Sequence, residues 1–386
     1  MTFLRSVLGL LLLGLFVYSP TAAQTPTNPP CAQRTQWVYI PPETCLETVF
    51  EELRNEGLRS VGGLAFTPDG TLYVARPALN QIWRMKPDGN HYFEKPTVFA
   101  ADLPEPPLGL TYDEPTSAWY VSSDTMLLKL TDNDDDGSAE QTILVRDLPG
   151  RSGGWLGDVR VGPDRRLYVA KAASCDSCLE PDARRAALLS FALDGSDSRI
   201  VATGLRDAYS FTWTPDGALY IVDNERQNQA AELNVVPAGQ TGLDFGWPRC
   251  DAQRRPIAGI DGATADYCAT TTAPILTFDA DSHPTGIVYY AANAFPQYTG
   301  ALFICFAGSW DNTVISGHTL IVARLDAAGA VASTGRLIPY SQQTTSDASI
   351  IKTSFHPYRP YSLVISPDGW LYISIAEGRV YRFRPL

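Results

Sequence analysis

The stretch FTWTPDGALYIV (211–222) decides the fold, because it reads as one complete β-hairpin. In its Pro-Asp-Gly turn, proline sets φ, aspartate can accept backbone hydrogen bonds, and glycine takes a positive φ at low cost. The flanking residues alternate and are rich in β-branched and aromatic side chains, as expected of strands. The same pattern recurs as LAFTPDGTLYVA (64–75), VRVGPDRRLYVA (159–170) and LVISPDGWLYIS (363–374). Arg165 stands where the other turns have glycine, so we expect that turn to differ slightly.

Two weaker copies complete the set of repeats. They are LGLTYDEPTSAWYVS (108–122) and TGIVYYAANAFPQYTGALFIC (285–305). The six units begin near residues 64, 108, 159, 211, 285 and 363. Repeats of about 40–50 residues with several strands each are typical of β-propellers. The sequence therefore predicts an all-β, six-bladed β-propeller with long loops at 224–284 and 306–360, and a pair of β-sandwiches is the competing interpretation.

Composition narrows the possible partners. The chain has 386 residues, 45% of them hydrophobic, which excludes a wholly disordered protein. Its 30 glycines and 29 prolines imply many turns. The formal net charge of −12 argues against nucleic acid or an anionic membrane surface as a partner.

The N-terminus predicts export. Residues 1–23 combine Arg5, an apolar run at 8–18 and small residues before a cleavage point after Ala23. This pattern is typical of a secretory signal peptide, and an uncleaved anchor is the alternative. We therefore expect a secreted or periplasmic protein with no integral membrane segment after cleavage. The expected organisation is a signal peptide at 1–23, an N-terminal extension at 24–50 and the propeller at 51–386.

Export makes disulfides the expected state of the seven cysteines. Proximity in sequence suggests the pairs Cys31–Cys45, Cys175–Cys178 and Cys250–Cys268, although sequence alone does not fix connectivity. Cys305 lies within the strand-like run ALFICF and is expected to be a buried free thiol. The alternative interpretation of Cys175-x-x-Cys178 is half of a zinc site or a redox pair.

An ordered series of motifs resembles the glucose/sorbosone dehydrogenase family. The series comprises the segments 161–196, ATGLRDAYSFTWTPDGALYIVDNER (202–226), AELN (231–234), DFGWP (244–248) and FPQYTGALFICFAGSWDN (295–312). The resemblance covers essentially all of the chain after the predicted leader and is weakest before residue 60. It implies a six-bladed propeller that uses pyrroloquinoline quinone (PQQ) and calcium to oxidise a sugar, passing electrons to a separate acceptor.

The resemblance also implies cofactor-binding residues. Arg206 matches an arginine that contacts the quinone, and Arg359 matches an arginine that faces the same central cavity. The acidic and polar positions that approach cofactor and calcium are matched by Asp223, Asn224, Glu225 and Glu232. Guanidinium groups suit a tricarboxylate such as PQQ because they pair with carboxylates in a bidentate fork. Blade-to-blade salt bridges are the competing role for both arginines.

The general base of the family is not matched. Trp155 stands at the position of the family's histidine, and Ala307 begins the segment that the family starts with His-Gly-Ser-Trp-Asn. A base must take the proton of the sugar hydroxyl, and histidine suits this role because its pKa lies near neutrality. The remaining candidate bases are His283, His356, Asp158 and Asp207.

The segment DNDDDGSAE (132–140) is a candidate calcium loop. Its alternating carboxylates followed by glycine resemble the first half of an EF-hand loop. Ile143 stands at the twelfth position, where that loop has its closing glutamate, and Glu140 could substitute in part. The candidate ligands are Asp132, Asp134, Asp136 and Glu140, and the competing interpretation is a solvated acidic turn.

Three functions remain open from sequence. The first is a PQQ-dependent sugar dehydrogenase. The second is a family member that binds a carbohydrate or a partner without redox catalysis, which the missing histidine favours. The third is a lactonase-type hydrolase with a central calcium, which the scarcity of histidines and the lack of a triad motif weaken. A nicotinamide enzyme is disfavoured because no GxGxxG motif lies between a strand and a helix.

Overall fold

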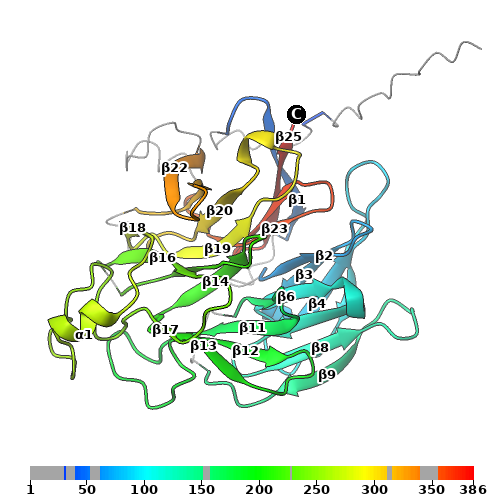
Figure 1. Cartoon of the computed structure of the whole chain (residues 1–386). Helices are drawn as coiled ribbons and strands as arrows, with labels where there is room; N and C mark the ends of the chain where they lie inside the picture. Colours follow the sequence, from blue (N-terminus) through cyan, green and yellow to red (C-terminus); the bar gives the residue numbers. More distant parts are fainter. Residues whose placement is uncertain are drawn as a thin grey trace, which may run out of the picture.

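The computed structural model describes residues 30–31, 40–52, 61–150, 157–226, 228–310, 315–339 and 355–386. The described residues form six antiparallel sheets that follow one another around a common centre, as the colour sequence in Figure 1 shows. This arrangement is a six-bladed β-propeller, so the predicted fold class is confirmed. The predicted signal peptide at 1–23 lies outside the described residues, as does Trp155. None of the helices in the described ranges has the length and hydrophobicity needed to cross a membrane.

Each blade begins with one of the predicted hairpins. The first blade contains β2 (Leu64–Phe66), β3 (Leu72–Arg76), β4 (Gln81–Met85) and β5 (Thr97–Ala100). The second contains β6 (Gly109–Asp113), β7 (Ala118–Ser122), β8 (Leu127–Thr131) and β9 (Glu140–Val145). The third contains β10 (Val159–Val161), β11 (Arg166–Lys171), β12 (Ala187–Ala192), β13 (Arg199–Thr203) and the short parallel strand β17 (Leu243–Asp244).

The other three blades follow the same order. The fourth contains β14 (Ala208–Trp213), β15 (Leu219–Asp223), β16 (Ala230–Val236) and β18 (Leu276–Ala280). The fifth contains β19 (Pro284–Tyr289), β20 (Ala301–Phe306), β21 (Thr319–Leu325) and β22 (Val331–Ile338). The sixth contains β23 (Pro360–Ile365), β24 (Leu371–Ile375), β25 (Arg379–Pro385) and β1 (Thr44–Glu51). Within the described ranges, three short 3-10 helices lie at Pro77–Leu79, Glu114–Thr116 and Pro296–Tyr298.

The sixth blade closes the ring with β1, the first strand among the described residues. β1 pairs with β25 in antiparallel register, from Thr44 opposite Pro385 to Glu51 opposite Arg379. The blue and red strands lie side by side in Figure 1. The propeller is expected from sequence to begin at residue 51, whereas β1 (Thr44–Glu51) already belongs to the sheet of the sixth blade. No local turn signal reveals this strand, because its partner lies at the other end of the chain.

The turn of the third hairpin is expected from sequence to differ slightly, but its backbone resembles that of the other turns. Arg165 has a φ of 63°, in the same region as Gly70, Gly217 and Gly369 at the equivalent turns. Its guanidinium forms a two-pronged ion pair with Asp113 of the preceding blade. An arginine is therefore tolerated there because it gains an inter-blade contact that glycine cannot make.

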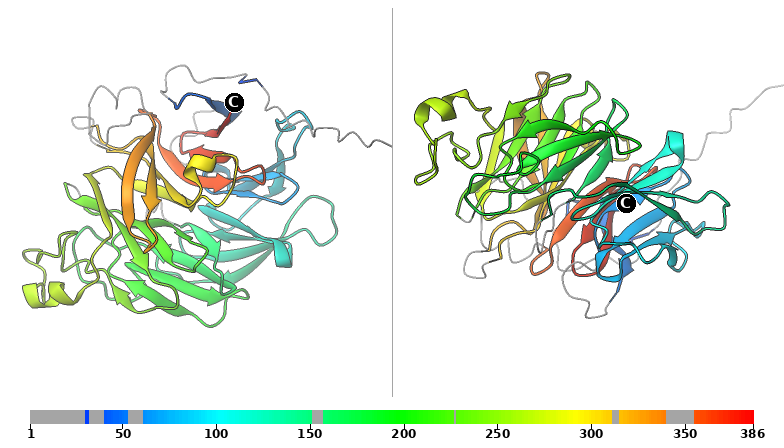
Figure 2. Two further views of the ribbon diagram at one scale, coloured as in Figure 1. Left: turned by 45° about the horizontal axis from the view of Figure 1, so that its top comes forward. Right: turned by 90° about the horizontal axis from the view of Figure 1, so that it is seen from below.

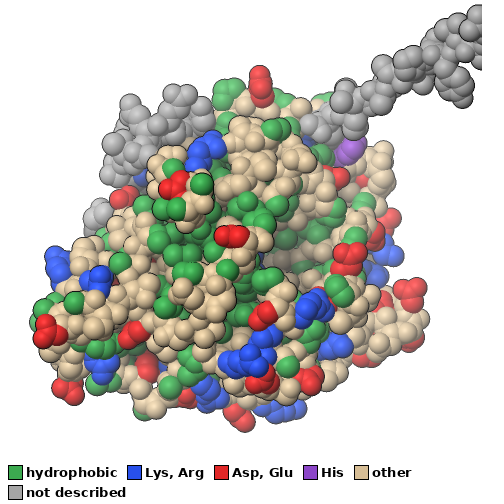
Figure 3. All heavy atoms as spheres, viewed as in Figure 1, with side chains coloured by type: hydrophobic (Ala, Val, Ile, Leu, Met, Phe, Trp, Pro, Cys, Tyr) green, Lys and Arg blue, Asp and Glu red, His purple; other side chains and the backbone are tan. Residues whose placement is uncertain are grey.

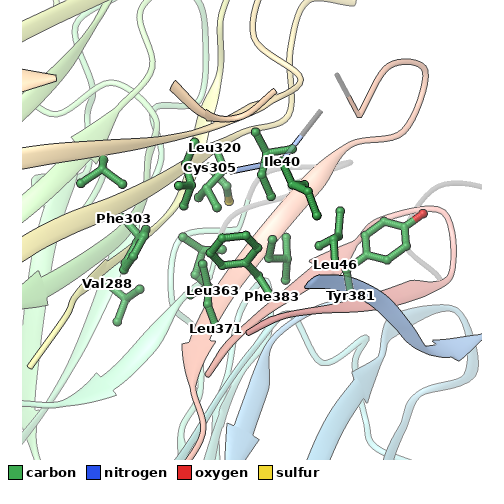
Figure 4. Packing of buried hydrophobic residues seen from close by; sticks show 14 of the residues in the cluster. Ile40, Leu46, Val288, Phe303, Cys305, Leu320, Leu363, Leu371, Tyr381 and Phe383 are labelled. Atoms are coloured by element: carbon green, nitrogen blue, oxygen red, sulfur yellow. The ribbon is translucent and has the colours of Figure 1, made fainter. Parts of the chain in front are cut away.

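Hydrophobic side chains fill the space between neighbouring blades. Figure 4 shows the cluster between the fifth and sixth blades, with Phe303 and Cys305 from β20 facing Leu363, Leu371 and Phe383. Cys305 is fully buried and free, as predicted, and its burial raises the pKa of its thiol to about 12. The three expected disulfides are present: Cys31–Cys45, Cys175–Cys178 and Cys250–Cys268.

The longest insertion lies at the rim. Between β17 and β18 the chain forms a lobe that contains α1 (Ala265–Thr270) and the Cys250–Cys268 disulfide. Figures 1 and 2 place α1 at the edge of the molecule in every view, away from the centre of the ring. The lobe is therefore not part of the centre where the blades converge. On the face shown in Figure 3, acidic and basic side chains are interspersed.

Candidate functional site

One face of the propeller gathers most of the residues that the sequence analysis selected. The inner strands β14, β19 and β23 begin at this face, and their partners β15, β20 and β24 end there. A small pocket opens between these strand ends. Its lining residues are Tyr209, His283, Thr285, Ala307, Trp310, Arg359, Pro360, Tyr361 and Ala376. Its open volume is about 10 Å³, so a ligand larger than a water molecule requires side chains to move.

His283 has the tautomer of a proton acceptor. Its Nδ1 lies 2.9 Å from the carbonyl oxygen of Asp281. A carbonyl only accepts hydrogen bonds, so Nδ1 carries the proton and Nε2 keeps its lone pair. Burial lowers the pKa of His283, which keeps the ring neutral near pH 7. Among the four candidate bases, His283 is therefore the one whose position and protonation both suit the role.

Arg359 holds the neighbouring loop and supports an exposed aromatic ring. Its guanidinium donates to the carbonyls of Ala307, Gly308 and Ser309 at 3.1, 2.8 and 3.0 Å. The indole of Trp310 stacks on it, with the guanidinium carbon 3.8 Å from the ring centroid. Trp310 is 47% exposed, so much of its surface remains open to a ligand. The structure thus gives Arg359 a structural role in addition to its place in the pocket.

Arg206 is buried and surrounded by acceptors. Its Nη1 donates to the carbonyls of Asn224 (3.3 Å) and Glu225 (2.9 Å) and lies 3.4 Å from Asp207. Its Nη2 pairs with Asp176 at 2.5 Å, inside the loop closed by the Cys175–Cys178 disulfide. The arginine predicted to bind the cofactor is therefore engaged by other residues of the chain. One of these residues, Asp176, has a side chain that is 74% exposed.

Three buried carboxylates lie beside Arg206. Oxygens of Asp223, Glu225 and Glu232 lie within 4.8 Å of one another, and all three side chains are buried. Asp223 accepts from the backbone N–H of Arg206 (2.9 Å) and of Asp207 (2.7 Å). Pairing of β15 with β16 places Asp223 directly opposite Glu232. We call this group the acidic triad.

The acidic triad has too little positive charge around it. Burial is the first cause that raises the pKa values of all three carboxyls, and their mutual repulsion adds to it. Glu225 Oε2 is buried without a hydrogen-bond partner, as are the side-chain oxygens of Asn224 and Asn234. Buried carboxylate and amide oxygens without partners are the ligands that a hard cation such as Ca²⁺ prefers. The donor set therefore fits a bound divalent cation.

The triad and the pocket form one continuous centre. Asn224, which follows β15, donates from Nδ2 to the carbonyl of Pro284 at 3.4 Å. Pro284 begins β19 directly after His283. The charges of Asp207 and Arg206 both act on the pKa of His283. The sequence-selected residues on β14, β15 and β19 are thus brought together.

The other candidate bases have different surroundings. Asp158 lies in the central channel, where it pairs with Arg160 and accepts from Ser210. Asp207 is buried beside Arg206. His356 does not line the pocket, and its ring packs edge-on against His318 with centroids 4.9 Å apart. These contacts give no support to Asp158, Asp207 or His356 as the general base of the pocket.

The candidate calcium loop lies in the outermost hairpin of the second blade, between β8 and β9. Carboxylate oxygens of Asp132, Asp134 and Asp136 lie within 4.8 Å of one another. Glu140 instead accepts from the backbone and side-chain nitrogens of Asn133 at 3.1 and 3.0 Å. Three of the four predicted ligands therefore lie close together, and the fourth, Glu140, is hydrogen-bonded within the loop.

Sequence reasoning missed Tyr209, Trp310 and Asp176. Tyr209 and Trp310 stand next to strand ends on the pocket face, and that position was a usable signal once the blades were assigned. Asp176 carried no signal, because its contact with Arg206 joins two loops of different blades.

The comparisons with known proteins agree with this architecture. The family model described as "Glucose / Sorbosone dehydrogenase" matches residues 177–382. The chain belongs to the glucose/sorbosone dehydrogenase family. The chain is 26% identical over 176 residues to a curated relative, an uncharacterized protein of Borreliella burgdorferi. That match covers 44% of the chain and 46% of the relative, so the matched region spans about half of each protein.

Solved structures share the fold at low identity. The holo form of the PQQ domain of pyranose dehydrogenase from Coprinopsis cinerea superimposes with a TM-score of 0.74, 16% identity, and coverage of 92% of this chain and 99% of that one. The calcium structure of a Trichoderma reesei Family AA12 protein gives the same values. The PQQ-bound aldose sugar dehydrogenase of Streptomyces coelicolor gives a TM-score of 0.62, 17% identity, and coverage of 89% and 99%.

Proposed function

We propose that this family member is an exported dehydrogenase that oxidises a CH–OH or aldehyde group of a sugar with bound PQQ and calcium. The observation that carries the proposal is His283, a neutral histidine with a free Nε2 in the pocket beside Trp310. Family membership and PQQ-containing neighbours of the same fold support it. The signal-like residues 1–23 and the three disulfides support export.

The side chains of the pocket have different roles in the proposed reaction. When bound, PQQ would supply a quinone that can accept a hydride, with its two electrons, from the substrate carbon. His283 Nε2 takes the proton of the substrate hydroxyl, and the Asp281 carbonyl holds the imidazole in the required tautomer. The open surface of Trp310 offers a platform for a planar ring.

The residues fit the cofactors to different degrees. The acidic triad offers three carboxylates to a cation. A bound divalent cation would offset the buried negative charge that these carboxylates already carry. Arg206 can form an ion pair with a carboxylate of PQQ if that carboxylate replaces Asp176, whose side chain is mostly exposed. Arg359 already donates to three carbonyls, so its remaining contribution is to orient Trp310.

The test is reconstitution of the full chain with PQQ and Ca²⁺, followed by reduction of an artificial dye over a panel of aldoses. We expect activity in the wild type and a loss of about 10²–10⁴-fold in kcat for His283→Asn, as for removal of a general base. His356→Asn is the matched control, since His356 lies outside the pocket, and it should keep the wild-type rate. Absence of dye reduction with every aldose would refute the proposal, and equal rates for both variants would refute the role of His283.

A second candidate function is carbohydrate binding without redox chemistry. It is favoured by the engagement of both predicted cofactor arginines with protein acceptors. Under this alternative, the reconstituted protein binds a sugar but neither takes up PQQ nor reduces the dye.

A further inference from the structure

A second cavity lies at the other end of the central channel. It has a volume of about 400 Å³, within the range of about 300–1,000 Å³ typical of small-molecule sites. Its walls include the ends of inner strands, such as Phe66 of β2, Tyr112 of β6 and Trp213 of β14. The pocket with His283 lies where the inner strands begin. The cavity and that pocket therefore belong to opposite faces of the propeller.

A polar pair lies at the inner end of this cavity. Arg160 Nε donates to Asp158 Oδ2 at 3.0 Å, and Ser210 donates to the same oxygen at 2.5 Å. Arg160 Nη2 is engaged by Ser210 and by the carbonyl of Ile287. Within the described part of the chain, Asp158 Oδ1 and Arg160 Nη1 make no hydrogen bond, and both side chains are 15–20% exposed. The cavity thus holds one free acceptor next to one free donor.

The walls add hydroxyl groups and aromatic rings. Thr111 and Ser362 line the cavity, and their hydroxyls have no hydrogen-bond partner among the described residues. Phe66, Tyr112 and Trp213 are only partly buried, because they border this open space. Aromatic side chains cover the apolar C–H surfaces of a saturated ring, while hydroxyls and the ion pair satisfy its oxygens.

We propose that this cavity is a second small-molecule site that binds a neutral polyhydroxylated ring of monosaccharide size. Asp158 and Arg160 neutralise each other, so an ionic ligand would bring an unpaired charge into the channel. A pair of adjacent hydroxyls can donate to Asp158 Oδ1 and accept from Arg160 Nη1 at the same time. This site is separate from the one proposed for oxidation, and it does not depend on PQQ or on calcium.

The test separates the two faces by mutation. Trp310→Ala removes the exposed platform of the other face and serves as the background. Binding of D-glucose and myo-inositol to this background protein is measured by isothermal titration calorimetry, with acyclic sorbitol as the ligand control. Asp158→Asn in the same background should weaken binding by at least about 10-fold, as for loss of a hydrogen bond to a charged group. Thr111→Val, which keeps the shape of the side chain, should weaken it by about 5-fold.

The outcomes are distinguishable. Binding of a ring by Trp310→Ala, with loss on Asp158→Asn and weaker binding of sorbitol, supports the second site. The proposal is overturned if neither D-glucose nor myo-inositol binds. It is also overturned if Asp158→Asn and Thr111→Val both leave the affinity unchanged. If Asp158→Asn does not fold, as judged by circular dichroism, Thr111→Val alone decides the question. Failure of this test leaves the dye-reduction result untouched, because that reaction concerns the opposite face.

Discussion

Two groups of buried charge in this propeller contrast sharply. In the sixth blade, Glu47 of β1 accepts from both Arg382 and Arg384 of β25, at distances of 2.5–3.0 Å. The three side chains are at most 1% exposed. In the fourth blade, the side chains of the acidic triad, Asp223, Glu225 and Glu232, are also buried. The charges of Arg206 and Arg226 act on Glu225, but Arg206 is shared with Asp176 and Asp207.

The pKa directions express this difference. Burial alone raises the pKa of Glu47, but hydrogen bonds from Arg384 and Arg382 outweigh it and hold that pKa below its usual value. In the triad burial and like charge act together, and the pKa values rise. The Glu47 group is therefore complete as a structural device, whereas the triad needs a cation or protons to be stable.

The largest effect is expected from breaking the complete group. Glu47→Gln leaves Arg382 and Arg384 buried without their counter-charge, so it should lower the free energy of unfolding by about 3–5 kcal/mol. Denaturant unfolding monitored by circular dichroism measures this change. Glu51→Gln is the matched control, because Glu51 pairs with Arg379 on the same two strands but is 37% exposed. The control should cost less than about 1 kcal/mol, and equal effects would contradict the contrast.

A smaller effect is expected from completing the incomplete group. Saturating Ca²⁺, at about 100 times its dissociation constant, should stabilise the wild type by about 2.7 kcal/mol, and EDTA should reverse this. Glu225→Gln should abolish the response of the melting temperature. Asp134→Asn is the matched control, since it removes one carboxylate from the peripheral loop 132–136. A calcium response that survives Glu225→Gln but disappears in Asp134→Asn would assign the ion to the outer loop instead.

The effect of a single pH unit is the smallest of the three, and the two groups respond to pH with opposite signs. Glu47 has a lowered folded pKa, so its contribution is present above its unfolded value of about 4.5 and is lost as pH falls through the folded pKa. Glu225 and Glu232 have raised folded pKa values, so their carboxyls favour the folded state at low pH and destabilise it as pH rises above about 4.5.

Metal-free protein should therefore be most stable in mildly acidic solution, with a slope of up to about 1.4 kcal/mol per pH unit per proton on the alkaline side. Unfolding curves between pH 4 and 9 in EDTA measure this slope. Calcium should flatten it, and a metal-free protein that gains stability steadily up to pH 9 would contradict the pKa assignment of the triad.

The blades could be predicted from sequence because their signals are local. Most inner hairpins carry their turn and their alternation within about fifteen residues. The predicted starts at 64, 108, 159, 211, 285 and 363 therefore fall within or directly before β2, β6, β10, β14, β19 and β23. β1 escaped because its partner β25 is more than 300 positions away in the sequence. The separation of the two partner strands along the chain, rather than a weak strand propensity, explains why β1 was not predicted.

The site was predicted in part for the same reason. Asp223 and Glu232 lie on adjacent strands of one hairpin, so their proximity follows from local pairing. The partners of Arg206 and Arg359 depend on how loops from different blades meet, and no spacing rule encodes that. Residue type correctly indicated a cationic and acidic centre, whereas the identity of each contact required the fold.

The closure of the ring by β1 and β25 also sets the order in which the protein can be completed. β25 lies between β1 and β24, so it supplies hydrogen bonds to both neighbours in the sixth sheet. During synthesis, the first five blades can form one after another as they emerge. β1 cannot pair until β25 (Arg379–Pro385), which follows it by more than 300 residues, has been synthesised. A chain truncated after Glu377 would lack the strand that joins β1 to the rest of the sixth sheet.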